Sequence, residues 1–202
     1  MPVAFALFAF ALAIYGIRYV NVDASTVSAS GTSAALVYAI LVSGIAELVA
    51  GVLGLIRGQA FLGYVTSVFG IWLLGLYCLF TAGAARKDFT PDAVGWYVLV
   101  LLVPVIILAV PDVRERNYPA VIAYVAITGL LVTLGSGFLQ LNHALDAAVA
   151  HKALPQLGST VNLLKTSAYF AFTAAAAVWY IMARDVYRIT GVSRTPHPYN
   201  AR

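Results

Sequence analysis

The chain has 202 residues, of which 62% are hydrophobic and only 10% are charged, and its net charge is +4 at pH 7. Soluble domains carry about 25% charged residues, and the mean hydropathy of +0.90 also lies outside their range. The composition therefore excludes a soluble globular domain and predicts an integral membrane protein.

Six apolar runs, separated by short clusters of polar and charged residues, have roughly the 20-residue length needed to cross a bilayer. They are continuously apolar, whereas the strands of a membrane barrel alternate over about ten residues. We therefore predict an all-α, polytopic protein with six transmembrane helices. The fourth run is short and contains Pro104 and Pro111, so we expect it to be bent or tilted. The runs are Val3–Val20, Ser33–Ile56, Ala60–Gly83, Trp96–Val110, Ala120–Leu139 and Val161–Ala183.

The first run begins near Met1, so a cleaved signal peptide is an alternative to a first membrane helix. The run has no basic residues before it, lacks a clean cleavage site of small residues, and is followed by further spans. These features favour a membrane helix.

The distribution of arginine and lysine predicts the orientation. With six spans, both termini share one side with the loops after the second and fourth runs, and most arginines fall on that side. The positive-inside rule then predicts cytoplasmic termini in a bacterial-type plasma (inner) membrane. Arginines near anionic headgroups account for the pI of about 9.3 without a nucleic-acid partner. We divide the chain into a transmembrane domain, residues 1–183, and a cytoplasmic tail, residues 184–202.

The longest connection is expected at about Gln140–Thr160, where residues Asn142–Lys152 could form a short helix at the outer surface. The one cysteine, Cys78, lies inside the third run and excludes a disulfide within the chain; we interpret it as a small apolar filler.

The sequence contains no catalytic motif and no metal-binding spacing. HExxH, GxSxG, P-loop and CxxC patterns are all absent, and His143, His151 and His197 fall in predicted loops or the tail. Lys165 invites comparison with a retinal-binding lysine, but six helices and a position near a helix end, where lysine can reach the interface, argue against it. We expect no enzyme activity, no cofactor and no metal.

The second run carries a stripe of small residues at four-residue spacing: Ala46, Ala50, Gly54 and Gly58. Gly44 and Gly51 widen this thin face. Such stripes let a neighbouring membrane helix approach closely, so we predict that these residues, Gly51 included, pack against another helix.

Glu47 lies in the middle of the same run. An ionised carboxylate at the bilayer centre costs on the order of 3 kcal/mol, so it normally faces a bundle interior or a water-filled path. Glu47 is therefore either a proton-sensitive polar group beside a solute pathway or a structural residue hydrogen-bonded to Tyr64, Thr66 or Ser67.

The stretch SGIAELVAGVLGLIRGQAF followed by TSVFGIWL resembles the second and third helices of the acetate uptake transporter family, also called the succinate/acetate permease or GPR1/FUN34/YaaH family. Its members typically read GGIAQ, AG, a basic residue before GNTF, and TSYGSFW. The family's opening motif NPAPLGL also resembles MPVAFALFAF, and AVWYIMARDVYRITG resembles its closing pattern. The matching positions in the second and third runs are Gly44, Ile45, Ala46, Ala50, Gly51, Arg57, Gly58, Phe61, Thr66, Ser67 and Trp72.

Several positions depart from the family pattern. Met1 replaces the family's Asn, and Ala4 and Ala6 replace a Pro and a Gly of the opening motif. Glu47 occupies the usual Gln position, while Gly54 stands where the family has Glu. These departures put the substrate, more than the fold, in question.

The resemblance implies a six-helix protomer, usually in a hexamer, with a path for small monocarboxylates, and sometimes succinate, together with protons. Its narrowest point would be lined by Phe10, by Phe69 or the neighbouring Val68, and by Ile127. A hydrophobic constriction blocks hydrated ions, and donors on Tyr64, Thr66 and Ser67 could meet a carboxylate there.

We therefore predict a transporter or channel for small, acetate-like carboxylates that is oligomeric and proton-linked, with the carboxylate, the bilayer and copies of itself as partners. One alternative is a channel for a small neutral solute such as urea or a short amide. Another is an accessory subunit that transports nothing and packs against a larger membrane complex.

Overall fold

The computed structural model describes residues 2–23, 34–86, 90–151 and 157–191, and within this part of the chain all regular structure is helical. Six helical segments are long and apolar enough to cross a membrane. The predicted all-α, polytopic fold class is confirmed. The elements are α1 Pro2–Val20, α3 Ala34–Ile56, α4 Ala60–Cys78 continued by the π-helix η1 Leu79–Gly83, α5 Pro91–Val100, α6 Leu102–Arg114, α7 Tyr118–His151 and α8 Gly158–Ile189.

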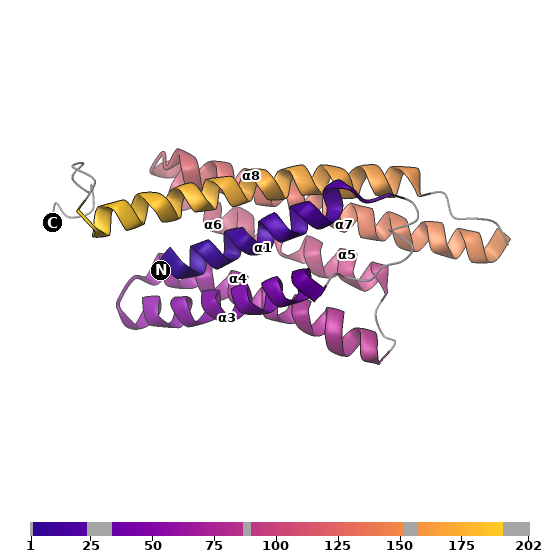
Figure 1. Ribbon diagram of the computed structural model, residues 1–202, viewed down its shortest axis with the longest axis horizontal. Helices are drawn as coiled ribbons and strands as arrows, with labels where there is room; N and C mark the ends of the chain where they lie inside the picture. The colour runs from indigo at the N-terminus through magenta and orange to yellow at the C-terminus, as the bar shows by residue number, and fades with distance from the viewer. Residues whose placement is uncertain (1, 24–33, 87–89, 152–156, 192–202) are drawn as a thin grey trace.

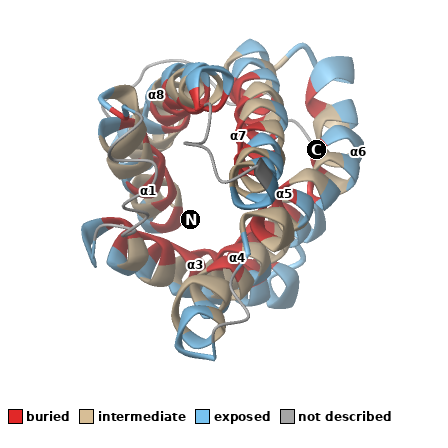
Figure 2. Cartoon of the chain, turned by 90° about the vertical axis from the view of Figure 1, so that its right-hand side faces the viewer, coloured by how far each residue is buried: buried red, intermediate tan, exposed pale blue. Residues whose placement is uncertain are grey.

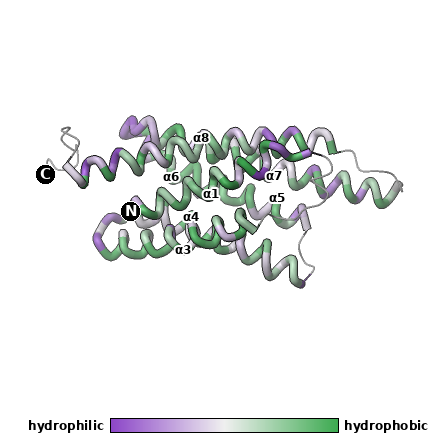
Figure 3. The backbone as a smooth tube through the Cα atoms, viewed as in Figure 1, coloured by the Kyte–Doolittle hydropathy of each residue, from purple (hydrophilic) through white to green (hydrophobic). Residues whose placement is uncertain are grey.

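The helices lie roughly along one axis, and the N-terminal end of α1 is at the same end of the bundle as the C-terminal end of α8 (Figure 1). Viewed end-on, α1, α3, α4, α5, α7 and α8 form a ring, with α6 outside it (Figure 2). Extensive contacts join α1 to α3 and α8, α3 to α4, and α7 to α5, α6 and α8. Apolar residues predominate along the helices, and hydrophilic residues gather toward their ends (Figure 3).

The fourth membrane segment is interrupted, as its prolines suggest. The chain leaves the α-helix at Leu101, between α5 and α6. Pro104 has no N–H to bond the carbonyl of Val100, and a proline ring clashes with the carbonyl four residues before it. At the break, Leu101 donates its N–H to the Val98 carbonyl, three residues before it, at 3.3 Å. After this break, α6 lies outside the ring of helices (Figure 2).

The expected loop after the fifth span is largely helical. Residues 142–151 continue α7 without interruption, so the predicted separate surface helix is wrong. No glycine or proline occurs between Gln140 and His151 to stop the helix, and Asn142 donates to the Asp146 carboxylate at 3.0 Å one turn later. The last predicted residue of that helix, Lys152, lies outside the described residues.

The last helix is longer than the run that predicted it. It begins at Gly158 and continues past Ala183 to Ile189, into residues that the sequence assigned to the tail. Residues 192–202 lie outside the described part of the chain. The division into a membrane domain and a tail stays a prediction.

Glycines set the spacing of α3 and α4. A Cβ on Gly70 of α4 would lie 2.5 Å from the backbone nitrogen of Leu48 and 2.9 Å from the carbonyl oxygen of Gly44, both on α3. A Cβ on Gly51 would lie 2.7 Å from the backbone nitrogen of Ser67. The two backbones therefore meet where side chains are absent, as small residues allow in membrane helices.

The predicted small-residue stripe does not make this contact. Ala46, Ala50 and Gly54 face a groove that α3 shares with the first turns of α1. Gly58 lies beyond α3 with a φ of 74° and no neighbour near its Cα hydrogens. Its N–H bonds the Leu55 carbonyl at 3.0 Å, and the next N–H bonds that of Gly54 at 2.9 Å, a Schellman arrangement that ends the helix. Assigning Gly58 to helix packing was wrong, because its role is to form the turn.

Candidate solute pathway

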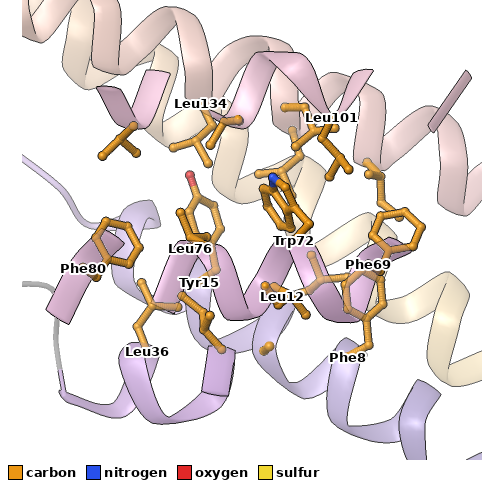
Figure 4. A pocket seen from close by; sticks show the side chains of 18 of the residues that line it. Phe8, Leu12, Tyr15, Leu36, Phe69, Trp72, Leu76, Phe80, Leu101 and Leu134 are labelled. Carbon is orange, nitrogen blue, oxygen red and sulfur yellow. The ribbon is translucent and has the colours of Figure 1, made fainter. Parts of the chain in front are cut away.

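An apolar cavity of about 60 Å³ lies between α1, α3, α4, α5 and α7 (Figure 4). On α1 its lining runs from Phe8 to Tyr19, and on α4 and η1 it runs from Phe69 to Phe80. The lining is formed mainly by Leu, Ile, Val, Ala and Phe, so the cavity offers an uncharged, weakly polar environment. A hydrated ion would lose its water shell here at high cost.

Two phenylalanines close the end of the cavity nearest the start of α1. The rings of Phe8 and Phe69 have centroids 5.2 Å apart at an interplanar angle of 48°, and both side chains are buried. Leu101 lines the same end, whereas Leu36 and Phe80 line the opposite end (Figure 4). The labelled side chains in Figure 4 follow this order. This end, which we call the narrow end because the two rings are in contact there, is lined by α1, α4 and the junction of α5 and α6.

The structure contradicts the constriction role predicted for Phe10 and favours Phe69 over Val68. Phe10 is 46% exposed and lies on the outer surface of the helix bundle, so its assignment to the constriction was wrong. Two residues turn an α-helix by about 200°, and Phe8 faces inward instead. Phe69 lines the cavity, while Val68 only packs against the core. Ile127 lines the cavity, and its place at the constriction stays a prediction.

Glu47 is buried on α3, with 1% of its surface exposed. Ser43, one turn earlier on the same face, is also fully buried. Within the described residues, neither Glu47 Oε1 nor Ser43 Oγ has a hydrogen-bond partner. Ser43 and Glu47 are not among the residues that line the cavity. Gly44 packs against Leu73 and Leu74, and Leu48 packs against Gly70, so Glu47 lies beside the part of α4 between Phe69 and Leu73.

The three predicted partners of Glu47 are placed differently from one another. Tyr64 is 57% exposed, on the outside of α4. Thr66 is buried, and its hydroxyl donates to the Leu62 carbonyl at 2.9 Å. Ser67 lies against Gly51, and its buried hydroxyl has no partner within the described residues. The described hydrogen bonds thus join none of them to Glu47.

The sequence did not single out Tyr15, which lines the cavity from α1. Its hydroxyl lies 2.5 Å from Ser167 Oγ on α8, and Ser167 in turn donates to the Leu164 carbonyl at 2.7 Å. The spacing of Phe8, Leu12, Tyr15 and Tyr19, in steps of four, three and four residues, is the sequence signal that could have identified this inward face.

Trp72, also on the cavity wall, is fixed against α5. Its indole nitrogen donates to the Tyr97 carbonyl at 3.4 Å, and the Tyr97 hydroxyl donates to the Trp72 carbonyl at 2.8 Å. The two rings stack with centroids 6.1 Å apart. Gly75 makes room for this pairing, because a Cβ there would collide with the Tyr97 hydroxyl.

A sequence profile identifies the family. The GPR1/FUN34/yaaH profile matches residues 1–198. The chain belongs to the GPR1/FUN34/yaaH family. This is a family of membrane transporters associated with acetate transport, which makes the chain a multi-pass membrane protein of a transporter family. No curated protein and no solved structure matches the chain.

The positions that carried the family resemblance now have structural roles. Gly44 and Gly51 face α4 at the tightest part of the bundle, and Ser67 is the neighbour of Gly51. Trp72 lines the cavity next to α5. The motif of this family member therefore marks both the packing of α3 on α4 and one wall of the cavity.

Proposed function

We propose that the chain transports small monocarboxylic acids such as acetate, with a proton, through the cavity between α1, α3, α4, α5 and α7. The observation that carries the proposal is the apolar cavity itself, closed by Phe8 and Phe69, in a member of a family associated with acetate transport. An apolar constriction favours a neutral or neutralised solute over a hydrated ion.

The size of the cavity supports a small solute. A water-sized sphere needs about 10–15 Å³ of such space. The cavity, at about 60 Å³, therefore holds only a few such spheres in a row. Acetic acid has four non-hydrogen atoms and is of this size. A dicarboxylate such as succinate would need the cavity to widen.

We assign Glu47 the role of a proton-sensitive group beside the narrow end. A permanently charged carboxylate in that position would repel a carboxylate solute, whereas a protonated one would not. The family resemblance also supports a homo-hexamer in a bacterial-type plasma membrane, and we propose both on that basis.

Uptake of radiolabelled acetate into proteoliposomes under an inward proton gradient tests the proposal. We expect uptake above that of protein-free liposomes, increasing as the external pH is lowered and decreasing with a protonophore. Protein-free liposomes are essential, because neutral acetic acid also crosses lipid. Urea uptake that is indifferent to the gradient would instead indicate a neutral-solute channel, and no flux of either solute would indicate an accessory subunit.

Glu47→Gln tests the assigned role in the same assay. The substitution keeps the shape of the side chain but removes the group that binds a proton, so we expect the uptake rate to depend less on pH. Ser43→Ala, one turn away on the same buried face, is the matched control and should keep the wild-type pH profile. An unchanged profile in Glu47→Gln would make Glu47 a structural residue.

A further inference from the structure

A groove of about 490 Å³ lies between α3 and the first turns of α1. Ala46, Ala50 and Gly54 of α3 leave it hollow, because they have little or no side chain. Its bulkier residues, such as Ile45 and Val49, are about half exposed, so the groove faces the outside of the bundle. All of its lining is apolar or small except for one charged residue, Arg57, at the end of α3.

The groove is long enough to follow a lipid chain through one leaflet of a bilayer. On α3 its lining extends from Val42 to Arg57, which is a rise of about 22 Å along an α-helix. Half of the hydrocarbon core of a bilayer is about 15 Å thick. The membrane helix α3 ends at Ile56, so Arg57 lies where a headgroup would be and the apolar lining lies at the depth of the acyl chains.

Arg57 needs an anion that the described part of the chain does not provide. Its side chain is exposed, and among the described residues it takes part in no ion pair. A second copy of the chain is a poor source of this anion. Of the acidic side chains at this end of the bundle, Asp112 and Asp185 are bonded to neighbouring side chains, and Glu115 interacts within the chain as well. A lipid phosphate is free to bind, and a guanidinium holds a phosphate with two parallel hydrogen bonds.

We propose that the groove between α1 and α3 binds one anionic phospholipid, with its phosphate on Arg57 and an acyl chain along Ala46, Ala50 and Gly54. The apolar lining selects a hydrocarbon chain, and the arginine selects a negatively charged headgroup. This site lies outside the candidate solute pathway, so it is independent of the solute that the protein transports.

Native mass spectrometry of the detergent-purified protein tests the headgroup contact. Titration with palmitoyl-oleoyl phosphatidylglycerol, which is anionic, and with the matching phosphatidylcholine, which has no net charge, gives an apparent Kd for the first lipid bound. We expect phosphatidylglycerol to bind about fivefold more tightly, the effect of one arginine beside an anionic lipid. Arg57→Gln should lose most of this preference, and Arg57→Lys should keep it. Arg114→Gln removes an exposed arginine from the end of α6, outside the groove, and should also keep it.

Ala50→Leu tests the place of the acyl chain. The larger side chain fills the groove, so we expect the apparent Kd of both lipids to rise by about threefold or more. Ala176→Leu makes the same change at an exposed position of α8 and should leave both values unchanged. Glycerol 3-phosphate carries the phosphate without the chain and should not displace the lipid at equal concentration. All variants should match the wild type in size-exclusion profile.

The results that would overturn the site are distinct from one another. Equal binding of the two lipids by the wild type, or a preference that survives in Arg57→Gln, would remove Arg57 from lipid binding. Unchanged affinities in Ala50→Leu would exclude the groove. A smaller oligomer in Ala50→Leu would make the groove a contact between copies, and displacement by glycerol 3-phosphate would make Arg57 a site for free phosphate. None of these readouts depends on transport, so a failure of the proposed function would not be mistaken for a failure of this site.

Discussion

Gly70→Ala is expected to destabilise the bundle, although it adds a single methyl group. That group would lie 2.5 Å from the Leu48 nitrogen and 2.9 Å from the Gly44 oxygen, and both atoms belong to the backbone of α3. Because backbone atoms cannot rotate away, α3 and α4 must separate. Overpacking of this kind costs about 1–3 kcal/mol, which we expect to see as a lower midpoint of thermal unfolding in detergent.

Gly83→Ala is the matched control at the end of the same membrane segment. Among the described residues, a Cβ there would meet only the Leu79 side chain, at the ordinary contact distance of 3.8 Å. Alanine is also the better helix former by up to about 1 kcal/mol, so the control should be neutral or slightly stabilising. Equal midpoints for Gly70→Ala and Gly83→Ala would contradict the close approach of α3 and α4.

Phe69→Ala is expected to change which acids are transported. Removing one ring of the Phe8–Phe69 pair widens the narrow end, so the uptake of butyrate relative to acetate should increase. Phe10→Ala removes the same side chain from the outer surface and should leave the ratio unchanged. Radiolabelled uptake of both acids under one proton gradient gives the ratio directly.

Loss of a buried ring typically lowers the free energy of unfolding by about 3–5 kcal/mol, so a smaller substitution at the same position is also needed. Phe69→Leu keeps most of the apolar volume and should shift the same ratio in the same direction by less. Unchanged ratios in both folded variants would show that Phe69 does not limit the size of the solute.

The membrane helices were predictable because a helix needs about 20 apolar residues to cross the bilayer. The first three runs match α1, α3 and α4 with η1 closely, since charged or glycine-containing turns bound them. The end of α7 was not predictable in this way. Polar residues after Gln140 suggested a loop, but a helix can extend beyond the apolar zone when no glycine or proline stops it.

The candidate site was predictable only in part, because a sequence motif aligns positions without giving their rotation about the helix. Phe8 and Phe10 are two residues apart and point to nearly opposite sides of α1. The motif alignment selected Phe10, whereas Phe8 lines the cavity. Tyr15 was missed for a different reason. It hydrogen-bonds Ser167, 152 positions away in sequence, and no local pattern joins the two.

Blocking the cavity with a thiol reagent tests most directly whether solute passes through it. In a Cys78→Ser background, which removes the exposed native thiol, Phe8→Cys places a thiol at the narrow end and Phe10→Cys places one on the outer surface. Treatment with methyl methanethiosulfonate, an uncharged reagent, should strongly reduce acetate uptake in Phe8→Cys, and a reductant should restore it. Uptake in Phe10→Cys should not change, and mass spectrometry confirms that both thiols are modified. Full modification of Phe8→Cys with undiminished uptake would contradict the pathway.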